Sequence, residues 1–344
     1  MTIDEKYMKR ALQLAELGLG KVSPNPMVGC VIVHDAEGKV LGEGWHDVYG
    51  GPHAERNAVA DVANKTLIKE STVYVTLEPC VHFGKTPPCT DLLLEWMPHR
   101  VVVCNVDPNP LVAGKGLEKL KQAGIEVVTG VLEEEGRWLN RRFFTFMEQK
   151  RPYIVLKWAQ TQDGFIARSN FSSKWISNEL SRDMVHTWRA QEAGIMVGTN
   201  TIMYDNPRLN VRNGSGLDPV RIIIDRELKL SVGFNVFDNS QVTLCYNSLK
   251  DEADEYTQYI KLDFNKSLLP QLLQDVYKRK ILSILIEGGS ALLQSFIDEG
   301  HWDEARVFTG EQSFEEGVAA PRFEGKLIEE KSIKGDRLAF YQNK

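Results

Sequence analysis

The chain has 344 residues, a length that favours two hydrophobic cores over one. Hydrophobic residues make up 42% and charged residues 26%, which excludes a disordered or fibrous protein. The net charge of −6 and the lack of a dense Lys/Arg run argue against a nucleic-acid partner. Apolar stretches such as 281–286 are far shorter than the roughly 20 residues that cross a bilayer, so we expect no membrane partner.

The N-terminus and the cysteines place the protein in the cytoplasm. Charged residues begin the chain, and an amphipathic pattern follows, which predicts a helix and not a secretory signal. An odd number of cysteines in such a chain does not suit a disulfide framework and favours metal or core roles. The five are Cys30, Cys80, Cys89, Cys104 and Cys245.

In chain order, the first part alternates strand-like and helix-like segments. We predict strands at 28–33, 73–77 and 101–106 and helices at 54–63 and 117–123. This alternation is typical of an α/β domain. A further helix is predicted at 133–142, and the pattern breaks from Met147 to Pro152 before a strand at 153–158. We therefore place one domain at 1–147 and a second at 151–344.

The second part repeats the alternation without repeating the sequence. We predict a helix at 178–190 and strands at 195–197, 220–224, 242–245 and 281–286. A second α/β domain follows from this pattern. Because no internal repeat links the two parts, we expect the domains to have different functions.

Three residues in the first part form a candidate zinc site. We predict that His53, Cys80 and Cys89 all lie at helix starts, where the helix dipole favours the thiolate that binds metal. Three protein ligands leave one tetrahedral position open, as in catalytic zinc sites. Any one of these residues alone would more often be a core thiol or a turn residue, but their joint occurrence favours zinc.

Glu55 is the candidate proton carrier beside this metal. It can take a proton from water and return it to a leaving amine, which is hydrolytic deamination. The known deaminase signature is H-x-E followed by P-C-x-x-C. Here H-A-E and P-C are present, but eight residues separate Cys80 from Cys89.

The inserted loop and its surroundings resemble the bifunctional deaminase–reductases of riboflavin biosynthesis. The matching motifs are N-P-M-V-G at 25–29, T-L-E-P-C at 76–80, the loop at 81–88 and D-P-N-P at 107–110. The resemblance implies a cytidine-deaminase-like three-layer α/β/α domain that acts on a diaminopyrimidinone ribosylamine 5-phosphate. It implies substrate contacts for Asn25, His46, His82, Lys85, Asp107 and Asn109.

A glycine-rich turn marks the second domain. Glu287-Gly288-Gly289-Ser290 stands between the strand at 281–286 and a predicted helix at 291–296. Such a turn exposes backbone N–H groups at a helix start and can hold a phosphate, although a tight turn without a ligand has the same pattern. There is no G-x-G-x-x-G motif.

The same family resemblance extends to this half and implies a dihydrofolate-reductase-like α/β domain that uses NADPH to reduce the ribosyl group to ribityl. It implies NADPH contacts for Ala159, Trp175, Thr201, Asp205, Gly288, Gly289 and Ser290. Substrate contacts would come from Lys157, Ser173, Arg189, Leu209, Arg212 and Glu287. Arg189 and Arg212 suit a phosphate, which a guanidinium can bind bidentately. Lys157 and Asp205 are the candidate proton donors.

Some features depart from the family, and other functions remain open. Thr161-Gln162 replaces the usual Ser and aliphatic residue, and 308–312 lacks an expected glycine pair, so residue roles are carried over only as far as Arg306. One alternative is a nucleoside or tRNA deaminase with an unrelated C-terminal nucleotide-binding domain. Another is a zinc-stabilised nucleotide-binding module without turnover, which would have no use for Glu55. We expect a homodimer or a larger homo-oligomer.

Overall fold

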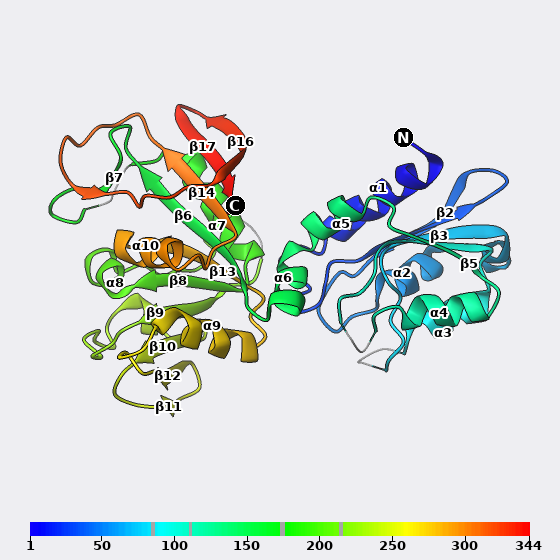
Figure 1. The fold of residues 1–344 in the computed structure, drawn as a ribbon, viewed down its shortest axis with the longest axis horizontal. Coiled ribbons are helices and arrows are strands. Elements are labelled where there is room, and N and C mark those ends of the chain that lie inside the picture. The colour runs from blue at the N-terminus through cyan, green and yellow to red at the C-terminus, as the bar shows by residue number, and fades with distance from the viewer. Residues whose placement is uncertain (84–86, 110–111, 173–175, 213–215) are drawn as a thin grey trace. The chain divides into compact units, whose positions relative to one another are not determined.

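The structure is a computed structural model that describes residues 1–83, 87–109, 112–172, 176–212 and 216–344. The chain divides into two compact units, Met1–Gln149 and Lys150–Lys344 (Figure 1). All five cysteines are free thiols. Within the described ranges, no helix combines the length and the apolar character needed to cross a membrane.

A five-stranded mixed sheet forms the centre of the first unit. Its strand order is β2-β1-β3-β4-β5. Strand β1 pairs antiparallel with both β2 and β3, whereas β3, β4 and β5 are parallel. The strands are β1 (Gly29–His34), β2 (Lys39–Trp45), β3 (Ser71–Leu77), β4 (Arg100–Asn105) and β5 (Glu126–Thr129).

Helices cover both faces of this sheet. They are α1 (Ile3–Glu16), α2 (Ala54–Asp61), η1 (Lys65–Glu70), α3 (Cys89–Trp96), α4 (Lys115–Gln122), α5 (Glu133–Leu139) and α6 (Arg141–Gln149). Successive strand residues point to opposite faces. In β1, Cys30 and Ile32 pack in the cluster of α2, α3 and α4, while Val31 and Val33 pack against α1. The predicted three-layer α/β/α arrangement is confirmed.

Strand β2 was missed by the sequence analysis because glycines fill its buried positions. A Cβ at Gly42 would lie 2.3 Å from the carbonyl oxygen of Ala58, and one at Gly44 would lie 2.3 Å from its amide nitrogen. Only glycine allows α2 to approach β2 so closely. Strand propensity is low at such positions, yet this approach fixes the helix that His53 caps and that carries Glu55.

The predicted helix at 133–142 is confirmed for Glu133–Leu139, which form α5, but it ends at Asn140, where the second helix α6 follows. The Asn140 side chain exchanges two hydrogen bonds of 2.8 Å with the backbone of Met27 and so interrupts the helix. Helix α6 then continues to Gln149, past the predicted break at Met147, because it buries Phe143, Phe144 and Phe146.

The second unit contains a ten-stranded sheet with the order β11-β12-β10-β9-β8-β13-β6-β14-β17-β16. The strands from β12 to β14 are parallel, and β11, β17 and β16 are antiparallel to their neighbours. The bounds are β6 (Tyr153–Gln160), β8 (Gly194–Gly198), β9 (Val220–Ile224), β10 (Thr243–Asn247), β11 (Glu252–Ala253), β12 (Thr257–Lys261), β13 (Ser283–Gly288), β14 (Glu304–Thr309), β16 (Lys326–Ile333) and β17 (Asp336–Gln342). A separate pair is formed by β7 (Phe165–Ala167) and β15 (Val318–Ala319).

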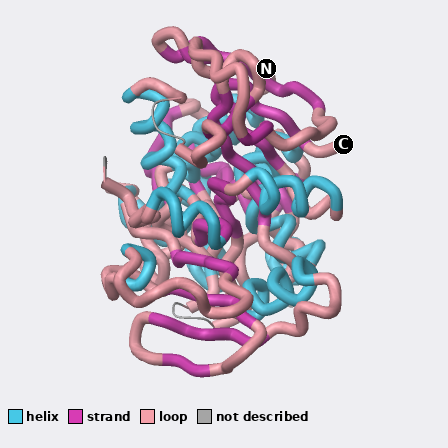
Figure 2. Tube along the Cα trace, turned by 90° about the vertical axis from the view of Figure 1, so that its left-hand side faces the viewer, coloured by secondary structure: helices cyan, strands magenta, loops and turns pink. Residues whose placement is uncertain are grey.

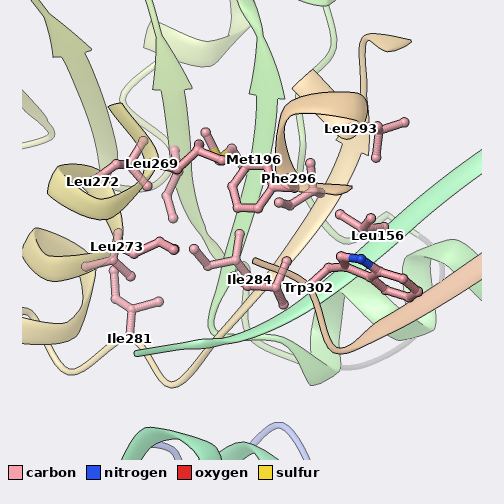
Figure 3. Close-up of a cluster of buried hydrophobic side chains, with 14 of the residues drawn as sticks. Leu156, Met196, Leu269, Leu272, Leu273, Ile281, Ile284, Leu293, Phe296 and Trp302 are labelled. Carbon is pink, nitrogen blue, oxygen red and sulfur yellow. The ribbon is translucent and has the colours of Figure 1, made fainter. Parts of the chain in front are cut away.

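Helices also flank both faces of the second sheet, as the cyan and magenta segments in Figure 2 show. They are α7 (Glu179–Gln191), α8 (Thr199–Asp205), η2 (Asn235–Phe237), α9 (Leu268–Lys278) and α10 (Ser290–Asp298). On one face, Leu272 of α9 and Phe296 of α10 pack with Ile284 of β13 (Figure 3). On the other face, Trp188 of α7 packs with Phe308 of β14.

Candidate active sites

The three predicted zinc ligands lie together in the first unit. The Nδ1 atom of His53 is 3.5 Å from Sγ of Cys80 and 3.4 Å from Sγ of Cys89. All three ligand atoms lie within 4.8 Å of one another. A tetrahedral zinc with bonds of about 2.3 Å to sulfur and about 2.1 Å to nitrogen places these atoms about 3.5 Å apart. The donor set and its spacing therefore fit zinc.

The prediction that all three ligands begin helices is wrong for Cys80. His53 precedes α2 as its N-cap and Cys89 is the first residue of α3, but Cys80 lies in the loop after β3. The start of α3 nevertheless stabilises the Cys80 thiolate, because the amide N–H of Cys89 donates to Sγ of Cys80 at 3.3 Å. Hydrogen bonds from Cys89 and His53 lower the pKa of Cys80 to about 4. Cys80 thus favours the thiolate that binds metal.

Glu55 is buried beside these ligands. It is the second residue of α2, its side chain makes a hydrogen bond with Cys89, and the residue is 3% exposed. Burial raises the pKa of Glu55, and the negative charge of Cys80 adds to the rise. A carboxyl group whose pKa is raised toward neutrality can both accept and return a proton.

His46 and Asn25 form a neutral, oriented pair next to His53. The Nδ1 atom of His46 lies 3.0 Å from the carbonyl oxygen of Pro52, which can only accept, so Nδ1 carries the proton. Its Nε2 atom then accepts from the Asn25 amide at 3.1 Å. Burial lowers the pKa of His46, which favours this neutral form. The His46 and His53 rings meet edge to face, with centroids 5.5 Å apart.

Asp107 and Asn109 lie in the loop after β4. The Oδ1 atom of Asp107 accepts the Asn109 N–H at 2.8 Å. Burial raises the pKa of Asp107 to about 6, and the charge of Glu78 contributes. His82 is exposed but close enough for its charge to act on Asp107. Lys85 lies outside the described residues.

The second unit contains a cavity of about 1200 Å³. Small-ligand sites usually measure roughly 300–1,000 Å³, so this cavity has room for a cofactor and a substrate together. Predicted residues that line it are Lys157, Ala159, Arg189, Thr201, Asp205, Arg212, Glu287, Gly288, Gly289 and Ser290. Leu209 is not among the lining residues, and its side chain is buried in a neighbouring hydrophobic cluster. Ser173 and Trp175 lie outside the described residues.

The glycine turn has the geometry that the sequence predicted. Strand β13 ends at Gly288, Gly289 has a φ of +72°, and α10 begins at Ser290. Only glycine adopts this conformation without strain. A Cβ at Gly288 would lie 3.4 Å from Oγ1 of Thr201, so two predicted cofactor segments are in contact here. The Ser290 hydroxyl donates to the carbonyl of Ala319 at 2.7 Å.

A buried ion pair forms part of the cavity wall. Arg189 donates through Nε and Nη2 to the two carboxylate oxygens of Glu287, both at 2.7 Å, and through Nη1 to Asn210 O at 3.0 Å. Burial would raise the pKa of Glu287, but Arg189 holds it at about 2. Lys157 of β6 is close enough for its charge to contribute, and burial lowers the pKa of Lys157. Much of the Arg189 fork is thus directed at Glu287.

Several residues that line this cavity were not predicted from the sequence. His186 lies three residues before Arg189 on α7, and Arg212 approaches it through Nη2, 3.3 Å from Nε2 of the imidazole. Burial lowers the pKa of His186, and the two arginines add to this. Phe171 and Tyr204 stack with centroids 4.5 Å apart and also line the cavity. Helical spacing from Arg189 would have indicated His186; no sequence signal indicated the aromatic pair.

Two family models match separate parts of the chain. The cytidine and deoxycytidylate deaminase zinc-binding region matches residues 1–105, and the RibD C-terminal domain matches residues 152–310. Together with the zinc cluster and the second cavity, they define a bifunctional enzyme: a deaminase with zinc as cofactor and a reductase that uses NADPH. The second unit has the dihydrofolate-reductase-like fold that was expected.

Relatives with known names or structures match nearly the whole chain. The riboflavin biosynthesis protein RibD of Aquifex aeolicus is 43% identical over 336 residues, 95% of this chain and 92% of that protein. The structure of a diaminohydroxyphosphoribosylaminopyrimidine deaminase/5-amino-6-(5-phosphoribosylamino)uracil reductase from Thermotoga maritima covers 99% of both chains, with a TM-score of 0.91 and 38% identity. Acinetobacter baumannii RibD, form 1, has a TM-score of 0.90 and 34% identity over 99% of both chains. This chain belongs to the RibD family of riboflavin biosynthesis proteins.

The family assignment decides between the hypotheses from the sequence. The chain is a deaminase and reductase of riboflavin biosynthesis, and the RibD C-terminal match disfavours a nucleoside or tRNA deaminase with an unrelated second domain. A zinc-stabilised module without turnover is disfavoured too, since the relatives are enzymes by name. A pyrimidine substrate is consistent with the names of the Aquifex aeolicus and Thermotoga maritima relatives.

Proposed function

We propose that the two units divide the two reactions. Residues 1–147 deaminate 2,5-diamino-6-ribosylamino-4(3H)-pyrimidinone 5-phosphate, and residues 151–344 reduce the ribosyl group of 5-amino-6-(5-phosphoribosylamino)uracil to ribityl. The observation that carries the first step is the His53, Cys80 and Cys89 cluster with Glu55 buried against it. The name of the Thermotoga maritima relative supports the choice of substrates.

In the deaminase unit, His53, Cys80 and Cys89 would hold the metal. Zinc supplies the Lewis acidity that makes water nucleophilic near neutral pH. Water adds to the ring carbon that bears the amino group, the C–N bond breaks, and ammonia leaves. Glu55 accepts the proton from water and delivers it to the departing nitrogen, and its buried position keeps bulk water from competing for that proton.

Substrate contacts in this unit would come from two pairs of residues near the candidate zinc ligands. Asn25 and His46 present oriented amide and imidazole groups beside His53. Asp107 and Asn109 present a second polar edge, held together by their own hydrogen bond. Such hydrogen-bonding groups suit a diaminopyrimidinone ring, which carries donors and acceptors around its edge. His82, with Lys85, would meet the phosphate of the substrate.

In the reductase unit, Thr201, Asp205, Ala159 and the turn from Gly288 to Ser290 would bind NADPH, which supplies a hydride when bound. Ser173 remains a predicted contact to the substrate, and Trp175 remains a predicted contact to NADPH. The substrate would lie against Lys157, Glu287 and Arg189. Leu209 remains a predicted substrate contact, although its side chain does not line the cavity.

A phosphate contact and a proton donor can also be proposed in this unit. Arg212 is better placed than Arg189 to bind the phosphate, because the Arg189 fork is directed at Glu287. We favour Lys157 as the proton donor, since burial lowers its pKa and makes proton release easier than from an exposed lysine.

We also propose a cytoplasmic homodimer or larger homo-oligomer. Free thiols in the metal site call for a reducing compartment. Strand β16 ends the large sheet and exposes Leu327 and Ile328, an edge that a second copy could cover. Analytical ultracentrifugation of the full chain would decide this, and a monomer at micromolar concentration would refute it.

Mass spectrometry of the reaction mixture tests the whole function. The diaminopyrimidinone phosphate is incubated with the full chain, with and without NADPH. Replacing an amino group by oxygen raises the mass by about one unit, and adding a hydride and a proton raises it by about two more. We expect the first gain without NADPH and both gains with it. A reaction that shows neither gain refutes the function, and a second gain without the first reverses the proposed order.

A further inference from the structure

Glu78 is a buried carboxylate that links the segment of Cys80 to the loop that carries Asp107. It follows β3 directly and lies two residues before Cys80. Only 4% of the residue is exposed. Glu78 belongs to the T-L-E-P-C motif at 76–80. A buried carboxylate needs hydrogen-bond partners to offset the loss of hydration, so its partners indicate what it does.

The partners of Glu78 are backbone N–H groups from the segment that follows β4. Its Oε2 atom accepts from Gly114 at 2.9 Å and from Asp107 at 3.3 Å. Its Oε1 atom accepts from Gly116 at 2.8 Å and from Leu117 at 3.4 Å. One carboxylate therefore holds both ends of the loop that carries Asp107 and Asn109.

The start of α4 strengthens this attachment. Gly116 and Leu117 belong to the first turn of α4, whose N–H groups point along the helix axis and carry partial positive charge. The approach is close: a Cβ at Gly116 would lie 2.4 Å from the carbonyl oxygen of Pro79. Helix α4 contacts α3, the helix that Cys89 begins (Figure 1). The loop is thus fixed against the same segment that positions Cys80.

We propose that Glu78 is a positioning residue of the deaminase, which sets the distance between the metal ligands and the Asp107–Asn109 edge of the substrate site. The inference rests on the proposed function, in which Asp107 and Asn109 contact the pyrimidine. Glu78 does not touch the substrate and acts through the Asp107 backbone. Misplacement of a contact by about 1 Å can cost up to about 10²-fold in rate.

The test is Glu78→Gln in the full chain. An amide keeps one acceptor oxygen but turns an NH₂ group toward N–H donors, so part of the attachment is lost. We expect the KM of deamination to rise about tenfold or more with a smaller change in kcat, because the lost contacts act in ground and transition state alike. Zinc content and the reductase kinetics of the same chain should stay at wild-type values. Glu78→Asp, which keeps the charge, should recover part of the lost affinity.

Two further variants separate this role from a general structural one. Glu118→Gln changes an exposed carboxylate in the first turn of the same helix, which pairs with Gln122 at 3.1 Å, and should leave KM unchanged. In the double variant Glu78→Gln/Asp107→Asn, the two effects on KM should be far less than additive, because one residue acts through the other.

Each result has a defined consequence. An unchanged KM in Glu78→Gln, additive effects in the double variant, or loss of zinc in both Glu78→Gln and Glu78→Asp would overturn the inference. If Glu78→Gln loses zinc and Glu78→Asp keeps it, the KM of Glu78→Asp is the test: a raised KM supports the inference, and a wild-type KM overturns it. Failure of the proposed function would appear in the wild-type enzyme, which would then leave the pyrimidine unchanged.

Discussion

Replacing Glu287 by Gln tests the ion pair in the wall of the reductase cavity. The variant keeps the shape of the side chain but removes its charge, and Arg189 then remains buried without its carboxylate. The exposed fractions of the two side chains are 10% for Arg189 and 8% for Glu287, so water from the cavity can replace the partner only in part. We expect the second unit to lose stability and the reductase to lose activity, while deamination continues.

The pKa of Glu287 gives the size of the effect. It falls from an ordinary 4.5 to about 2. At about 1.4 kcal/mol per unit, the ionised carboxylate contributes about 3 kcal/mol, near the lower end of the roughly 3–5 kcal/mol measured when a buried pair is broken. For a unit of this size, about 3 kcal/mol corresponds to a fall of about 6–12 °C in Tm.

The pH dependence has a definite sign. Because the folded pKa of Glu287 lies below its unfolded value, its stabilisation is complete above about pH 4.5 and is lost as the pH falls toward 2. The difference in Tm between wild type and Glu287→Gln should therefore shrink as the pH falls from about 5 to about 3. A group whose folded pKa is raised would give the opposite trend.

Differential scanning calorimetry of the full chain is the assay. The transition of the first unit is identified by adding a chelator, which should lower that transition alone. Glu330→Gln is the control, since its pair with Arg337 spans 3.4 Å and both side chains are about half exposed. Such a pair contributes only about 0–1 kcal/mol. A Tm of Glu287→Gln within about 2 °C of wild type at pH 7, or a difference that stays constant down to pH 3, would refute the reasoning.

Four other expectations follow. Glu55→Gln should keep zinc but reduce kcat of deamination by about 10²–10⁴-fold, because an amide cannot carry protons; unchanged turnover with verified metal content would contradict the role of Glu55. Cys80→Ser should lose zinc and deamination together, as elemental analysis and activity assays would show, and full activity without metal would rule out the site. Arg212→Ala should raise the reductase KM for the phosphorylated substrate while NADPH quenching of tryptophan fluorescence stays unchanged; an unaffected KM would place the phosphate elsewhere. A fragment ending at Gln149 should still bind zinc and the fragment 150–344 should bind NADPH, whereas a soluble, folded C-terminal fragment without NADPH binding would show that the reductase site needs both units.

Part of the fold could be predicted because it depends on local pattern. The strands β1, β3, β4, β9 and β13 are rich in Val, Ile and other apolar residues, as strands buried on both faces of a sheet are. Strand β2 and strand β16 lack this pattern: one is built around buried glycines, the other is exposed at the edge of a sheet. Their pairing depends on distant neighbours, so a local pattern could not indicate them.

The candidate residues of the deaminase site could be predicted from the sequence itself. Ligand types, their spacing and an adjacent glutamate indicate His53, Cys80, Cys89 and Glu55, since only a few side chains can bind zinc or carry a proton, and the structure brings the three candidate ligands together. The tertiary structure alone decided how these groups are held. The N–H of Cys89 donates to Cys80, and Glu78 accepts from the N–H groups of Asp107 and Gly114. Such hydrogen bonds between separate segments form only when the chain packs. The partner of Arg189 was also decided by the tertiary structure. From the sequence we expected Arg189 to bind a phosphate, but in the folded chain it is buried beside Glu287, whose carboxylate is its partner. Burial is a property of the folded chain and not of the local sequence.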